Sequence, residues 1–147
     1  NWMFLHNGQI GEFERVKYEL QCQLPESLFL KRMGTTDSEL IFLLMLHNGL
    51  CEQPVEAIRK TIIDISQMMK SKDIEEPLKA SICISDGEQF WAVRYSSDDD
   101  APTVFIRQEG ANIALASEPL EKSSGWKAVL PQSILEIKGD AVTSYAI

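Results

Sequence analysis

The apolar residues recur at helical spacing in the first half of the chain and at strand spacing in the second half. The opening residues 2–6 are aromatic and apolar, which predicts a short buried strand. Apolar positions then follow a helical period over residues 10–22, and charged residues cover the other face. We expect a helix there, which Pro25 ends or directly follows.

Two further helices are predicted before the period changes. Residues 39–46 are apolar nearly all round, which indicates a helix buried at the centre of the core. Thr36 or Asp37 can cap its start, and Gly49 suits the position after its end. Pro54 opens the next helix, whose apolar positions form a single stripe.

After Pro77 the apolar residues recur at every second position, which is typical of strands. The expected strands cover residues 79–85, 89–95, 103–107, 112–116, 134–138 and 141–146. Asp86-Gly87 and Gly139-Asp140 carry the residue types of tight hairpin turns. One strand, then helices, then a run of antiparallel strands predicts a layered α+β fold, with residues 1–147 as a single domain.

Two polar segments between these strands are predicted to be loops. Residues 96–102 hold consecutive aspartates but lack the glycine and glutamate spacing of a calcium-binding loop, so we expect a solvated hairpin tip. Gly125-Trp126 is also predicted to lie in a loop, with the indole covering the core.

Composition narrows the class of protein. The chain has 147 residues, of which 44% are hydrophobic and 24% charged, as in one soluble globular domain. A net charge of −8 argues against binding to nucleic acid and against docking on anionic lipid. No apolar run approaches the length of a membrane span, and no signal peptide is visible.

The three cysteines give little sign of chemistry. Cys22, Cys51 and Cys83 are widely spaced, with no Cys-x-x-Cys pair, and the chain has only two histidines. We therefore expect no zinc site, no disulfide framework and a reducing, cytoplasmic location. No basic group flanks any of the thiols in the sequence, so all three are interpreted as structural.

The first candidate for chemistry is Asn7-Gly8, which follows the apolar opening strand. An Asn side-chain N–H and a Gly backbone N–H in a rigid turn can stabilise the oxyanion that forms when an amide is attacked. The alternative is a plain turn between a strand and a helix, which the pair alone favours. The same triplet recurs at residues 47–49, where Gly49 is explained as a helix cap. Only the context after an apolar strand distinguishes the first copy.

The second candidate is Asp37, at the start of the apolar helix. A carboxylate there can bind the α-amino group of an amino-acid substrate. The alternative is helix capping, which local sequence favours. Glu39 is interpreted as a capping or first-turn acid rather than a catalyst.

Together these segments resemble the type 2 glutamine amidotransferase family, in its small stand-alone branch. The matching segments are residues 4–10 (FLHNGQI), 34–39 (GTTDSE) and 116–120 (ASEPL) followed by Trp126. The resemblance implies an N-terminal-nucleophile hydrolase, whose fold is an αββα layered sandwich. It also implies hydrolysis of the side-chain amide of glutamine or a γ-glutamyl compound through a cysteinyl thioester.

The resemblance assigns roles to individual residues. Asn7 and Gly8 match the oxyanion hole, Asp37 matches the carboxylate that binds the α-amino group, and His6 matches a motif position with a structural role. The family's nucleophile is an amino-terminal cysteine, and its arginine for the substrate carboxylate also lies upstream of the Asn-Gly pair. Since the sequence opens at Asn1, we expect a domain incomplete at its N-terminal side, inactive alone and active in the intact protein.

Two other functions stay open. The chain could be a degenerate, non-catalytic domain that binds an amino acid or a protein, or a structural α+β domain without a site. For the enzyme we expect a small-molecule substrate (glutamine or a γ-glutamyl amide), no cofactor, no metal, no nucleic acid and no membrane. An ammonia-accepting partner and a homo-oligomer remain open.

Overall fold

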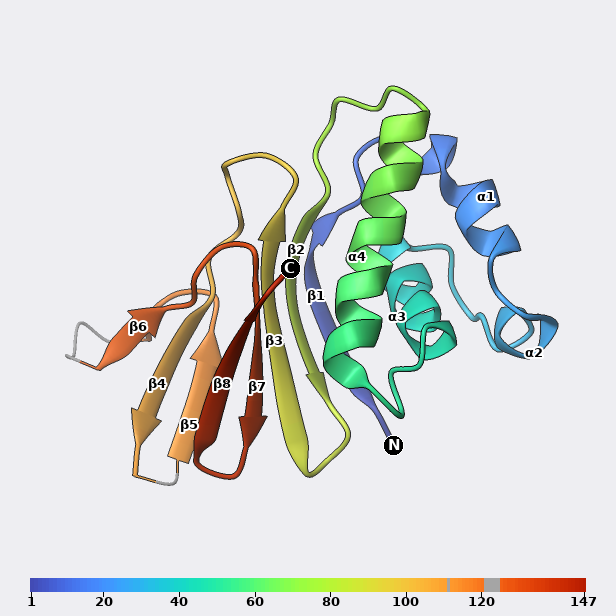
Figure 1. Ribbon diagram of the computed structural model, residues 1–147. Coiled ribbons are helices and arrows are strands. Elements are labelled where there is room, and N and C mark those ends of the chain that lie inside the picture. Colours follow the sequence, from blue (N-terminus) through green and yellow to red (C-terminus); the bar gives the residue numbers. More distant parts are fainter. Residues whose placement is uncertain (111, 121–124) are drawn as a thin grey trace. The chain divides into compact units, whose positions relative to one another are not determined.

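The computed structural model in Figure 1 shows that the chain folds into two units. One unit contains the strands and the other contains the helices. The structure describes residues 1–110, 112–120 and 125–147. The strand unit comprises Asn1–Gly8 and Lys79–Ile147, and the helical unit comprises Gln9–Leu78. The α+β class predicted from the sequence is confirmed.

The strand unit contains two sheets. The larger has five strands in the order β1-β2-β3-β7-β8, and the smaller has three in the order β5-β4-β6. The strands of the larger sheet are β1 (Met3–Gln9), β2 (Lys79–Ser85), β3 (Gln89–Ser96), β7 (Ser133–Lys138) and β8 (Ala141–Ala146). Those of the smaller sheet are β4 (Phe105–Glu109), β5 (Asn112–Ala116) and β6 (Trp126–Ala128).

Apolar side chains from both sheets pack into one cluster, so the sheets face each other. The cluster is formed by Ala92, Val104, Val129 and Leu135, with Ile106 and Leu115 packed against it. Ala92 pairs with Leu135 across β3 and β7, which places both side chains on the same face of the larger sheet. Burial of this face explains why the period of two along these strands was legible in the sequence.

Most strands match the prediction, but one predicted loop contains a strand, and another loop is not the predicted hairpin tip. Trp126 lies in β6 rather than in a loop, because a three-residue strand is too short to show a period. Residues 96–102 are not a hairpin tip, since β3 and β4, which they help to connect, belong to different sheets. The pattern of apolar residues shows where strands lie but not which strands pair.

The strand β1 also differs from the prediction. It is an edge strand that continues through Asn7 and Gly8 to Gln9, where a turn was expected. Met3 and Leu5 are 61% and 68% exposed, so the strand is not buried as predicted. An aromatic and apolar run fits an edge strand and a central strand equally well, which is why the sequence could not distinguish them.

The helical unit contains a 3₁₀ helix and four α-helices. Their bounds are η1 (Phe13–Arg15), α1 (Lys17–Cys22), α2 (Glu26–Phe29), α3 (Asp37–His47) and α4 (Pro54–Ser71). The helices α3 and α4 pack against each other, and each buries its apolar residues. None of the helices in the described ranges is long and apolar enough to cross a membrane.

The helix predicted over residues 10–22 is interrupted. Glu12 adopts a left-handed conformation with φ of 45°, which no helix accommodates, so only a 3₁₀ turn and the short α1 form. Pro25 lies just past the end of α1, as predicted, and is also the N-cap residue of α2. Apolar spacing persists across the break and hides it in the sequence.

Both ends of α3 match the prediction. The Thr36 hydroxyl accepts a hydrogen bond from the Glu39 backbone N–H at 3.3 Å, which makes Thr36 the N-cap. At the other end, the Gly49 N–H donates to Leu46 and the Leu50 N–H to Met45, at 3.2 and 3.0 Å. With φ of 95° at Gly49, these bonds form a Schellman motif.

The side chain of Arg94 joins the segments that flank the smaller sheet. From β3 its guanidinium donates to the carbonyl oxygens of Pro102, Val129 and Ala101 at 2.9, 2.7 and 3.3 Å. These carbonyls belong to the stretches that lead into β4 and out of β6. One half-buried side chain therefore satisfies three backbone acceptors near the inter-sheet cluster.

We expect Arg94→Met to lower the free energy of unfolding by about 2–4 kcal/mol, because three partly buried carbonyls lose a charged donor. Urea denaturation measures this change. Lys138→Met is the matched control: this lysine is 55% exposed and forms an ion pair with Glu136, so about 0.5 kcal/mol or less is expected. Equal losses in the two variants would contradict the role given to Arg94.

Candidate functional site

A cavity of about 390 Å³ lies between the two sheets and reaches β1. It is lined by Leu5, His6, Asn7, Ser81, Ile82, Cys83, Ala92, Val104, Leu115, Ala116 and Ser117. The walls are mostly apolar, and a few polar groups lie among them, as in many sites for small molecules. Asn7 is exposed, so its amide is available at the edge of this cavity rather than turned into the core.

Gly8 lies where the backbones of β1 and β2 approach too closely for a side chain. A Cβ atom at this position would lie 1.9 Å from the carbonyl oxygen of Lys79 and 2.7 Å from Nε2 of His6. The same imidazole nitrogen lies 3.3 Å from that carbonyl oxygen. The requirement for glycine is therefore a close approach within a sheet, and not the turn that the sequence predicted.

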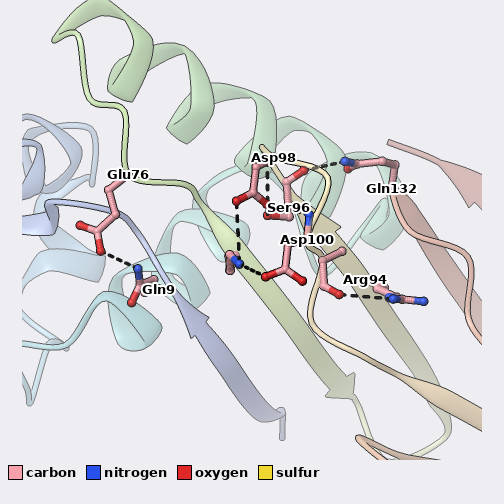
Figure 2. Close-up of polar contacts among 9 residues, drawn as sticks. Gln9, Glu76, Arg94, Ser96, Asp98, Asp100 and Gln132 are labelled. Atoms are coloured by element: carbon pink, nitrogen blue, oxygen red, sulfur yellow. Dashed lines mark hydrogen bonds and ion pairs between the residues drawn. The ribbon is translucent and has the colours of Figure 1, made fainter.

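The side chain of Lys79 contacts the acidic loop after β3. Ser96, Asp98 and Asp100 of this segment lie close together, as Figure 2 shows. The Lys79 ammonium lies 2.6 Å from a carboxylate oxygen of Asp100 and 3.8 Å from one of Asp98. The Ser96 hydroxyl donates to Asp98 at 2.5 Å, and Gln132 donates to the Ser96 carbonyl. Asp98 and Asp100 are thus paired with Lys79 and Ser96, although residues 97–100 are exposed to solvent as predicted.

These contacts shift the pKa values of Lys79 and Asp98. The hydrogen bond to Asp100 raises the pKa of Lys79, and the Ser96 hydroxyl lowers the pKa of Asp98. The lysine therefore stays charged and Asp98 stays ionised over a wider pH range than usual. Lys79, at the start of β2, thus has a paired ammonium group, and its backbone carbonyl lies beside His6 and Gly8.

Asp37 lies at the start of α3 and is half-buried. Its Oδ2 accepts a hydrogen bond at 3.0 Å from the backbone N–H of Ile10, the residue after β1. Its Oδ1 accepts from the Ser38 N–H at 2.7 Å and from the Ser38 hydroxyl at 3.3 Å. A carboxylate has about four lone-pair sites. One site on Oδ2 is left for a further donor such as an ammonium group.

Glu39 holds the loop before α3, in agreement with its interpretation as a first-turn acid. Its carboxylate accepts from the backbone N–H groups of Met33 and Gly34, both at 2.7 Å. The guanidinium of Arg32 lies 3.7 Å away. One carboxylate oxygen thus binds the backbone of Met33, and the other binds that of Gly34, the glycine that opens the GTTDSE segment.

The structure brings His6, Asn7 and Gly8 together in one extended segment, in contact with Lys79. Asn7 and Gly8 belong to the strand unit and Asp37 to the helical unit, so a joint site formed by all of them stays a prediction. Lys79 was not singled out from the sequence. The only signal was a glycine within an apolar strand, which indicates a close backbone approach.

The cysteines differ in their surroundings. Cys22 and Cys51 are exposed, and Cys83 is half-buried in β2, where it lines the cavity beside Asn7 and a second one of about 450 Å³. Burial raises the pKa of the Cys83 thiol, which keeps it protonated at neutral pH. Across residues 1–110, 112–120 and 125–147, no three or more His, Cys, Asp or Glu side chains are arranged to hold a metal ion.

We expect iodoacetamide to alkylate Cys83 at least about tenfold more slowly than Cys22 and Cys51 at pH 7.5, because the thiolate is the reacting form. Peptide mass spectrometry of the folded protein over time measures the three rates. Denatured protein is the control, in which the rates should become similar. Equal rates in the folded protein would contradict the effect of burial on Cys83.

Comparisons with solved structures give related proteins, although no protein-family model and no curated protein sequence matches the chain. A glutamine aminotransferase class-II domain protein from Silicibacter pomeroyi is 34% identical, with a TM-score of 0.91 over 99% of this chain and 67% of its own. A glutamine phosphoribosylpyrophosphate amidotransferase from B. subtilis is 15% identical, with a TM-score of 0.70 over 99% of this chain and 29% of its own. A predicted glutamine amidotransferase from Pseudomonas aeruginosa is 18% identical, with a TM-score of 0.61 over 98% of this chain and 60% of its own. The chain thus spans part of each of these proteins.

Proposed function

This chain belongs to the class-II (type 2) glutamine amidotransferase family, and we propose that the intact protein hydrolyses the side-chain amide of glutamine or of a γ-glutamyl compound. The family assignment rests on 34% identity over 99% of the chain. The same match confirms the α+β fold of the N-terminal-nucleophile hydrolases, over the part of the fold that the chain covers. The reaction and its residues are the proposal.

The proposed reaction forms and then hydrolyses a thioester. A cysteine thiolate attacks the amide carbon, and the carbonyl oxygen becomes an oxyanion that accepts from the Asn7 side-chain N–H and the Gly8 backbone N–H. When the C–N bond breaks, the nitrogen takes up a proton and leaves as ammonia. Water then attacks the thioester, which releases the carboxylic acid and the free thiol.

Two observations support Asn7 and Gly8 as these donors. Asn7 is exposed and lines the cavity between the sheets. Gly8 directly follows it in β1, where the close approach of the Lys79 carbonyl places its backbone against β2. Donors that are fixed before the reaction stabilise an oxyanion far better than mobile ones.

For Asp37 we propose binding of the α-amino group of the substrate. Its carboxylate is half-buried and already oriented by the backbone of Ile10 and Ser38. The remaining lone pair on Oδ2 can accept one N–H of an ammonium group.

We assign the nucleophile to none of the cysteines in this chain. Cys83 has a raised pKa, which is the reverse of what an activated thiol needs. Cys22 and Cys51 are exposed residues of the helical unit, whereas Asn7 and Gly8 belong to the strand unit. The proposal therefore takes the nucleophile, an amino-terminal cysteine by resemblance to the family, from sequence beyond these 147 residues.

The exposed Asn7 at the cavity edge, in a chain 34% identical to a class-II protein, carries this proposal. The test is release of glutamate and ammonia from glutamine, and of the corresponding acids from γ-glutamyl amides, by the intact protein. The 147-residue chain alone is the matched control and is expected to be inactive. Hydrolysis by that chain would overturn the assignment of the nucleophile. An inactive intact protein would overturn the proposed function.

The second candidate is a non-catalytic domain of the same fold that binds an amino acid or a protein. The contacts of Asp37 favour it, since hydrogen bonds to Ile10 and Ser38 explain this residue without a substrate. Under this alternative, glutamine raises the melting temperature of the intact protein but is not hydrolysed. A structural domain without a site would show neither the shift nor turnover.

A further inference from the structure

We propose that His6 is a positioning residue that fixes the Asn7-Gly8 backbone through the carbonyl of Lys79, an inference that rests on the proposed function. The imidazole Nε2 lies 3.3 Å from this carbonyl oxygen. A Cβ atom on Gly8 would lie within 2.7 Å of both groups. The imidazole, the carbonyl and the glycine backbone therefore meet at one point beside the proposed oxyanion donors.

The residue types of this segment explain why such a contact is useful. Strand β1 is paired with β2 in the larger sheet. Gly8 also has the greatest backbone freedom of any residue type. An oxyanion donor, however, must be held within about 0.5 Å and 10–20° of its productive geometry. A side chain that fixes this segment to β2 supplies the missing constraint.

The carbonyl is a suitable anchor because its own residue is held in place. The Lys79 ammonium is paired with Asp100 at 2.6 Å and with Asp98 at 3.8 Å. Asp98 is in turn bound by the Ser96 hydroxyl at the end of β3. Lys79, whose carbonyl the imidazole contacts, is therefore linked to the acidic loop and, through Asp98, to the end of β3.

The proposal requires the proton of the neutral imidazole to be on Nε2, which then donates to the Lys79 carbonyl. Simple packing is the competing explanation, because the His6 ring is half-buried and its centroid lies 6.3 Å from that of Phe4. The two explanations differ in one respect. Packing needs only the volume of the ring, whereas positioning needs an N–H donor at the place of Nε2.

The kinetic test compares His6→Leu, which keeps much of the volume, with His6→Gln, whose amide N–H can replace the Nε2 donor. In the intact protein, we expect His6→Leu to lower kcat for glutamine by about 10- to 100-fold, with KM within about twofold of wild type. His6→Gln should retain kcat within about threefold. Wild-type kcat in His6→Leu, or equal losses in the two variants, would overturn the proposal.

His47→Leu is the matched control, since this exposed histidine belongs to the other His-Asn-Gly triplet of the chain. It should leave both kinetic constants unchanged. Urea denaturation of all three variants shows whether they are folded under assay conditions. A kcat loss in His47→Leu as large as that in His6→Leu would overturn the assignment to His6.

A second measurement separates the proposal from the proposed function. The backbone order parameter of Gly8, from ¹⁵N relaxation of the intact protein without substrate, should be about 0.85 in wild type and His6→Gln, and below about 0.6 in His6→Leu. An unchanged order parameter in His6→Leu would overturn the positioning role. If the wild type lacks glutaminase activity but the order parameter falls, the proposed function fails and the positioning role of His6 stands.

Discussion

Replacing Asn7 by alanine in the intact protein is expected to lower kcat for glutamine hydrolysis by about 100- to 1,000-fold. This is the usual effect of removing one preorganised oxyanion donor, about 2.7–4 kcal/mol in the activation free energy. KM should change little, because the donor acts on charge that develops only in the transition state. Steady-state kinetics with glutamine, followed by glutamate release, measures both constants.

The fold should tolerate this change. Asn7 is exposed, so its truncation should alter the free energy of unfolding by about 0.5 kcal/mol or less. Retained stability would show that a loss of kcat comes from the missing donor rather than from unfolding.

The chain supplies a control with the opposite pattern. In the other His-Asn-Gly triplet, the Asn48 amide donates at 2.9 Å to the hydroxyl of Thr61, which is fully buried. Asn48→Ala should therefore cost about 1–3 kcal/mol of stability and leave kcat unchanged. A wild-type kcat in Asn7→Ala would overturn the assignment of Asn7 as an oxyanion donor. If Asn7→Ala loses stability but keeps the wild-type kcat, the role of Asn7 is structural.

The sequence was sufficient to predict elements in which local and tertiary preferences agree. The segment 39–46 is apolar all round, Thr36 caps its start and Gly49 its end, and the observed α3 has these ends. Strand β2 was equally legible, because its buried residues alternate with less buried ones over most of its length. Each such element carries its own signals of start, period and end.

The failures lie where long-range structure decides. The exposure of β1 depends on which strands it pairs with, and a local sequence pattern does not encode strand pairing. The break at Glu12 is a single left-handed residue within a segment of intact helical spacing. The pairing of Lys79 with Asp98 and Asp100 joins residues 19 and 21 positions apart in the chain and appears only after folding.

The candidate site contains both a successful prediction, of the residue types, and a failed one, of their backbone conformation. The sequence singled out Asn7 and Gly8 by residue type but attached them to a turn, whereas the structure extends β1 through both. The glycine is explained by the carbonyl of Lys79, 1.9 Å from its missing Cβ. The roles of Asn7 and Gly8 could be predicted from their residue types, because oxyanion stabilisation restricts which residues can serve. Their backbone geometry could not be predicted, because it depends on a partner strand more than 70 positions away in sequence.

The change Asp37→Asn is expected to raise KM for glutamine by about 100-fold in the intact protein, with kcat reduced by about fivefold or less. The amide keeps the size of the carboxylate but loses the charge that pairs with the substrate ammonium. Such a charged, partly desolvated contact contributes about 2–5 kcal/mol to binding. Steady-state kinetics measures the effect, with KM taken as a binding constant where chemistry is slow.

A substrate without the α-amino group separates this binding role from the structural one. The variant also weakens the contacts of Asp37 with Ile10 and Ser38, so some loss of stability is expected in either case. Thr36→Ala is the control, since it removes the N-cap of the same helix, at a cost of about 1 kcal/mol, and leaves the charge in place. Its KM for glutamine should equal that of wild type.

Glutaramate, which is glutamine without the α-amino group, should be hydrolysed equally well by wild type and Asp37→Asn. If the variant loses the same factor on both substrates, the carboxylate only holds the start of α3, and the substrate ammonium binds elsewhere.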